Sequence, residues 1–143
     1  MRYRHDMPFG AQLLDDGRVR FRLWAPSADT VEIGLSHAQG EEFQKMAAAG
    51  DGWFELITDR AGAGTAYRYR IDRDLTVPDP ASRFNPWDVM GPSVVVDPRG
   101  FEWQDEGWRG RDWSESVIYE LHVGTFTRAG SFSAIKERLD YLV

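Results

Sequence analysis

Short runs of alternating apolar and polar residues dominate the first two thirds of the chain. In one of them Val19, Phe21 and Leu23 alternate with Arg20 and Arg22. A period of two predicts a strand with one buried and one solvated face. Similar runs, the second of them weaker, occupy residues 31–35, 43–46, 53–57, 67–71 and 94–96.

Turn residues separate these runs. Asp16-Gly17 lies between two apolar runs and predicts a hairpin, and Pro26 ends the second strand because proline cannot donate to a sheet. Several short strands spaced by about 8–12 residues are typical of an antiparallel sandwich. We therefore predict a mainly β fold, an immunoglobulin-like antiparallel β-sandwich over residues 1–97.

The pattern changes in the last third. Residues 98–116 are polar and glycine-rich with three tryptophans, which predicts a connector, and residues 117–123 are nearly all apolar, as in a strand covered on both faces. Ser131 can cap a helix whose apolar residues have helical spacing; they are Phe132, Ile135, Leu139 and Leu142. A strand followed by a helix is half of a βαβ unit and needs a parallel strand. We therefore expect residues 117–143 to begin a parallel strand–helix layer that belongs to a larger protein.

Composition narrows the ligands and the location. The chain of 143 residues has a net charge of −6 and no cysteine, which disfavours nucleic acid and anionic membranes and excludes disulfides. The sequence has no signal-like or membrane-spanning apolar run, so we expect a cytoplasmic protein. An uncovered strand edge in the tail could also recruit a second copy of the chain.

Candidate metal ligands are sparse. His5, His37 and His122 have no metal-ligand spacing, so we expect neither a metal nor a cofactor. Acidic residues such as Asp79 and Glu120 fit turns and strand packing better than catalysis.

Aromatic residues are the candidates for binding a sugar. By parity Trp24 lies on the polar face of its strand, Trp53 follows a turn, and Trp87 lies in a proline-rich loop. Flat rings exposed beside polar groups can stack on sugars. The same tryptophans also suit a contact with another domain.

Four stretches carry a resemblance to a known family. FRLWAPSADTVEIGL, GDGWFELITDRAGAGTAYRYRID, VPDPASRFNPWDVMGPSVVVDP and VIYELHVGTFTRAGSFSAIKERLDYL resemble the sandwich module and first barrel segment of the α-amylase clan of glycoside hydrolases. The combination of PDPASR, GPS and VDP is most similar to the malto-oligosyltrehalose trehalohydrolase family. One departure is Met90, where the family would have histidine.

The resemblance implies a glycogen-binding-module-like accessory domain of a retaining enzyme that cleaves an α-1,4 bond in maltooligosyl trehalose and releases trehalose. Residues 117–143 would be the first strand and helix of its catalytic (β/α)8 barrel. The catalytic carboxylates would come from later strands of that barrel, so no catalytic residue is expected in this chain. His122 would lie near the mouth of the barrel, where it could hold residues that contact the substrate. The rest of the barrel would pack on the linker tryptophans. The alternatives are part of a branching or debranching enzyme, or a stand-alone α-glucan-binding module.

Overall fold

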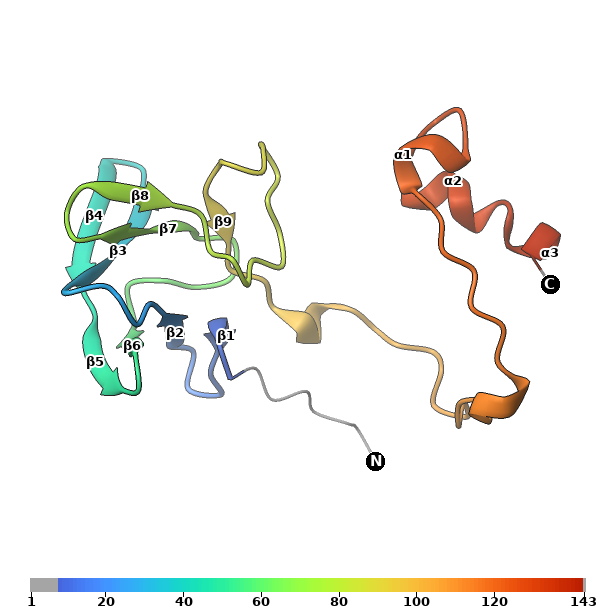
Figure 1. Ribbon diagram of the computed structural model, residues 1–143, viewed down its shortest axis with the longest axis horizontal. Coiled ribbons are helices and arrows are strands. Elements are labelled where there is room, and N and C mark those ends of the chain that lie inside the picture. Colours follow the sequence, from blue (N-terminus) through green and yellow to red (C-terminus); the bar gives the residue numbers. More distant parts are fainter. Residues whose placement is uncertain (1–7, 143) are drawn as a thin grey trace. The chain divides into compact units, whose positions relative to one another are not determined.

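The computed structural model describes residues 8–142 and divides into two compact units, one ending at Glu102 and one beginning at Trp103 (Figure 1). This division falls inside the stretch 98–116 that the sequence indicates as a connector. Among the described residues, no helix has the length and apolar character needed to cross a bilayer.

The first unit consists of two antiparallel sheets. A four-stranded sheet has the order β1-β2-β6-β5, and a five-stranded sheet has the order β4-β3-β7-β8 with β9 also paired to β7. The strands are β1 (Gly10–Leu13), β2 (Val19–Trp24), β3 (Val31–His37), β4 (Gly40–Lys45), β5 (Ala47–Gly50), β6 (Trp53–Thr58), β7 (Ala66–Ile71), β8 (Leu75–Val77) and β9 (Ser93–Val94). The predicted mainly β sandwich is confirmed, although β5 and β8 were not anticipated.

The core lies between the two sheets and follows the predicted parity. Val19, Phe21 and Leu23 point inward from β2, while Arg20 and Arg22 stay partly exposed. From the other sheet the rings of Tyr67 and Tyr69 are fully buried, and the ring of Phe21 lies 4.9 Å from that of Tyr67. Aromatic contacts therefore join the two sheets at their centre.

The hairpin predicted at Asp16-Gly17 joins β1 and β2, which pair with Leu13 opposite Val19. The amide of Leu14 donates to the carbonyl of Arg18 at 2.8 Å, and Gly17 adopts a φ of 86°. Glycine suits this turn because the left-handed backbone region costs it nothing.

The second unit contains only short helices. They are a 3-10 turn η2 (Trp113–Glu115), α1 (Val123–Phe126), α2 (Phe132–Lys136) and α3 (Leu139–Leu142), and none of them buries a residue. A further 3-10 turn, η1 (Pro98–Gly100), lies at the end of the first unit. Ser131 caps α2 as predicted, because its hydroxyl accepts from the amide of Ala134 at 3.3 Å.

The strand expected at 117–123 is not formed. Residues 117–122 have no strand assignment, Val117 is 94% exposed, and residues from 123 enter α1. A strand needs a neighbour for its backbone hydrogen bonds, and no strand of the described second unit supplies one. The expected helix is also divided, because Arg138 makes a tight turn to the carbonyl of Ile135 between α2 and α3.

Candidate functional site

The outer face of the four-stranded sheet carries two of the three tryptophans singled out by sequence. Trp24 ends β2 directly opposite Trp53 at the start of β6, so both side chains lie on the same face. Trp24 is 59% exposed, and its indole nitrogen donates to the carbonyl of Asp51 at 3.1 Å. This hydrogen bond holds one large ring in a defined orientation at the surface.

Trp53 offers less open ring than Trp24. The guanidinium of Arg22 lies 4.7 Å from its ring centre, and the ring of Phe9 is stacked near it with centroids 6.5 Å apart. The same arginine approaches Glu55 at 3.5 Å and donates to the carbonyl of Pro8 at 3.1 Å. The ring of Trp53 is therefore partly covered by its neighbours, whereas the ring of Trp24 is exposed to solvent. We call these two residues the Trp24–Trp53 pair.

Trp87 and His122 lie elsewhere. Trp87 is on the loop between β8 and β9, and no ring contact joins it to the Trp24–Trp53 pair within residues 8–142. His122 is exposed at the N-terminus of α1, where its Nδ1 atom lies 3.2 Å from the hydroxyl of Thr125. It belongs to the second unit, and it makes a local contact there.

The outer face of the five-stranded sheet is closed by ion pairs. Arg68 forms two hydrogen bonds to Glu41, at 2.6 and 2.9 Å, and this contact raises the pKa of the arginine. Arg70 binds Glu32 at 2.8 Å and covers the ring of Phe43 at 3.6 Å. The hydrogen bond from Arg70 lowers the pKa of Glu32. Both arginines of β7 are therefore paired with acids.

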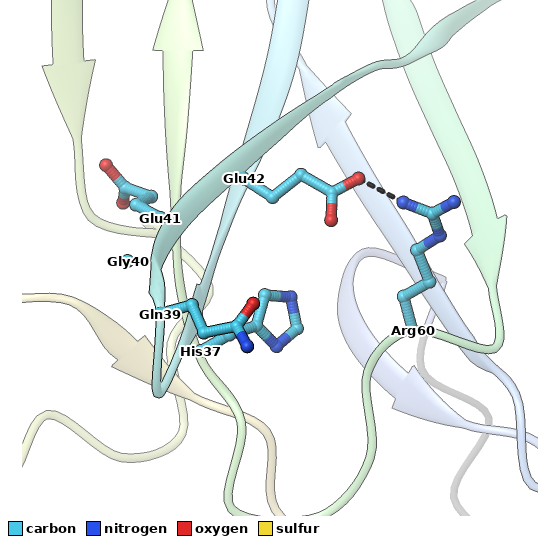
Figure 2. A pocket seen from close by; sticks show the side chains of 6 residues that line it. All are labelled: His37, Gln39, Gly40, Glu41, Glu42 and Arg60. Carbon is cyan, nitrogen blue, oxygen red and sulfur yellow. Dashed lines mark hydrogen bonds and ion pairs between the residues drawn. The ribbon is translucent and has the colours of Figure 1, made fainter.

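A polar depression lies at the turn between β3 and β4 and was not anticipated from the sequence (Figure 2). It is lined by His37, Gln39, Gly40, Glu41, Glu42 and Arg60. Figure 2 shows Glu41 and Glu42 pointing to opposite sides of β4, and Glu42 is paired with Arg60. Successive residues of a strand face opposite sides, so these two carboxylates cannot flank one glycosidic bond as a retaining hydrolase requires.

A buried carboxylate anchors the PDPASR segment. Asp79 is 4% exposed and accepts hydrogen bonds from the hydroxyls of Tyr67 at 2.7 Å and Tyr69 at 3.4 Å. Burial raises the pKa of Asp79 and of both tyrosines. The nearby Arg83 donates to the carbonyl of Ala11 in the other sheet at 3.2 Å. Asp79 is therefore structural, as its turn position suggested, but its burial was not visible in the sequence.

Metal ligation finds no support in the described chain, where no group of three or more His, Cys, Asp or Glu side chains is placed to hold an ion. His5, the remaining sequence candidate, lies outside the described residues.

Comparison with known proteins places this geometry in a family. The chain is 41% identical over 132 residues to a malto-oligosyltrehalose trehalohydrolase of Rhizobium sp. (strain M-11), and the match includes 88% of this chain. It is 34% identical over 141 residues to the 1,4-alpha-glucan branching enzyme GlgB of Nitrosomonas eutropha.

Among solved structures, a Salmonella typhimurium protein provisionally named an alpha amylase superimposes with a TM-score of 0.84 at 42% identity and covers 96% of this chain. The chain spans about a fifth of the length of each of these proteins: 22% of the trehalohydrolase, 19% of the branching enzyme and 23% of the solved chain. The family pattern of carbohydrate-binding module 48 matches residues 8–96, which contain both sheets. The chain therefore belongs to the carbohydrate-binding module 48 family, the isoamylase N-terminal domain.

Proposed function

We propose that this chain is the N-terminal accessory part of a glycoside hydrolase that cleaves an α-1,4-glucosidic bond in maltooligosyl trehalose and releases trehalose. The observation that carries the proposal is the 41% identity to a malto-oligosyltrehalose trehalohydrolase over 132 residues. The lower identity to a branching enzyme, 34%, makes that activity the weaker alternative.

The 143-residue chain itself would not perform the hydrolysis. A retaining glycosidase needs two carboxylates about 5–5.5 Å apart in one cleft. In the polar depression, Glu41 and Glu42 point apart, and each is bound by an arginine. The catalytic pair would come from a barrel in the longer protein, and we propose that this barrel also covers the linker tryptophans Trp103, Trp108 and Trp113, all of which are exposed.

Product analysis tests this function. The full-length gene product and the 143-residue chain are each incubated with maltooligosyl trehalose, and free trehalose is measured. We expect release by the full-length protein alone. Trehalose release by the short chain would refute the accessory role, and transfer of glucan to new α-1,6 branches by the full-length protein would favour the branching enzyme.

A second candidate function is binding of α-glucan at the Trp24–Trp53 pair. The exposed, hydrogen-bonded ring of Trp24 lies beside Arg22 and Glu55 on the same face, and a fixed ring with polar neighbours suits sugar stacking. Titration of the chain with maltoheptaose or glycogen, followed by tryptophan fluorescence, should saturate. The signal should be lost in Trp24→Ala and kept in the control Trp108→Ala. Equal titration of the two variants would exclude Trp24 as the platform.

A further inference from the structure

The loop between β8 and β9 exposes four large apolar side chains within seven residues. Phe84 is 51%, Trp87 64%, Val89 78% and Met90 73% exposed. Single apolar residues at a surface are ordinary, but a group of this kind marks a contact site. Figure 1 shows this loop as an excursion between β8 and β9 at the end of the five-stranded sheet.

Hydrogen bonds hold the loop in one shape. The carbonyl of Phe84 accepts from the amide of Val94 at 2.9 Å, and the carbonyl of Asp88 accepts from the amide of Gly91 at 2.9 Å. The side-chain amide of Asn85 reaches the carbonyl of Gly91 at 3.4 Å. The buried Asp79 anchors the start of the segment. A loop that is ordered before binding loses little conformational entropy when a partner covers it.

The chemistry of the loop selects its partner. The three charged residues of the loop are engaged within the domain. Asp79 accepts from the hydroxyl of Tyr67, Arg83 binds the carbonyl of Ala11, and Asp88 accepts from the amide of Val89. Sugar stacking needs several polar groups beside the ring. Asp88 is an exposed polar neighbour of Trp87 and is engaged by the amide of Val89, whereas Phe84, Val89 and Met90 are exposed and apolar. The fitting partner is therefore an apolar protein surface rather than a saccharide or a charged ligand.

We propose that Phe84, Trp87, Val89 and Met90 form a preorganised docking surface for another folded domain of the same full-length protein. The relatives give the reason to expect this partner in the same polypeptide. Each match includes most of this chain but only about a fifth of the relative, so the relatives have further domains. This inference rests on the proposed accessory role, and it adds the surface through which the module is attached.

Methionine oxidation provides a test on the native residues. Met90 is 73% exposed and Met46 1% exposed, so the second residue is an internal reference. Hydrogen peroxide oxidises accessible thioethers, and mass spectrometry resolves each site. We expect Met90 to oxidise readily in the 143-residue chain and roughly tenfold more slowly in the full-length protein, because burial removes access to the sulfur. Met46 should be slow in both.

Paired substitutions sharpen the test. Val89→Asp in the full-length protein should return the oxidation rate of Met90 toward that of the short chain, because a carboxylate cannot be buried in an apolar contact without a partner. Leu75→Asp, an exposed apolar position on β8, should leave Met90 protected. Circular dichroism of both variants in the 143-residue chain checks that the sandwich still folds.

Three results would overturn the proposal: equal oxidation of Met90 in the two proteins, protection already present in the short chain, or protection that rises with concentration of the short chain. The last would indicate a second copy as the partner. Trehalose release is measured on the same full-length preparation. Release with an unprotected Met90 refutes only the docking surface, and protection without release refutes only the proposed activity.

Discussion

The hydrogen bonds to Asp79 predict how two similar substitutions should differ. Tyr67 and Tyr69 are both buried, and both hydroxyls point at the same carboxylate oxygen, at 2.7 and 3.4 Å. A hydrogen bond to a charged group contributes about 1.5–3 kcal/mol to stability. At 3.4 Å the contact lies at the long limit of such a bond, so the Tyr67 hydroxyl should supply most of the stabilisation.

We therefore expect Tyr67→Phe to lower the free energy of unfolding by about 2 kcal/mol and Tyr69→Phe by less than about 1 kcal/mol. For a domain of this size, 2 kcal/mol lowers Tm by about 10 °C. The assay is urea unfolding at neutral pH followed by far-UV circular dichroism of the strands. The slope against urea should be the same for all variants, because the surface exposed on unfolding does not change.

A double-mutant cycle with Asp79→Asn assigns the effect to the pair. In the Asp79→Asn background the cost of Tyr67→Phe should shrink, because the charged acceptor is gone. Equal losses for the two tyrosines, or an unchanged cost of Tyr67→Phe in that background, would refute the argument that one short bond to Asp79 holds the PDPASR segment.

Further predictions concern pH, glycine geometry and the outer faces. Burial raises the pKa of Asp79 in the folded state, so a protonated Asp79 stabilises the fold more than an ionised one. This stabilisation is fully present below the pKa of the unfolded chain and is lost as pH rises through the pKa of the folded state. The stability of the wild type relative to Asp79→Asn should therefore fall from acidic to neutral pH, and a flat difference would contradict the assignment. Glu32 should show the opposite pH dependence, because the hydrogen bond from Arg70 lowers its pKa. Its stabilisation of the fold is present above the unfolded pKa and is lost as pH falls through the folded pKa. The variant Glu32→Gln should lack this loss of stability in the same pH series. Gly52→Ala should destabilise more than Gly64→Ala, because both residues have positive φ (79° and 88°) but only at Gly52 would a Cβ meet Pro26, at 2.7 Å. A non-glycine residue in the left-handed backbone region alone costs about 1–2 kcal/mol. Similar decreases in thermal stability for the two variants would show that the contact with Pro26 relaxes without cost.

Much of the sandwich could be read from local pattern. Strand parity predicted which residues of β2 and β7 are buried, and Asp16-Gly17 predicted the first hairpin, because alternation and turn chemistry act between neighbours in the chain. The exposed position of Trp24 follows from the same parity. The apolar loop residues Phe84 and Val89 were also visible as apolar letters among prolines and polar residues, but nothing local shows that they stay uncovered.

Contacts between distant segments required the tertiary structure. Asp79 is buried because the fold brings two tyrosine hydroxyls of β7 to its carboxylate, and Trp53 has little open ring because Arg22 and Phe9 lie on it. Neither arrangement leaves a periodic signal. The segment 117–123 also depends on distant partners. Its apolar residues form a strand only when a neighbouring strand exchanges backbone hydrogen bonds with them, and the described second unit contains no such strand. The amino-acid sequence by itself determined which side chains seek burial, and the tertiary structure decided which partners they find.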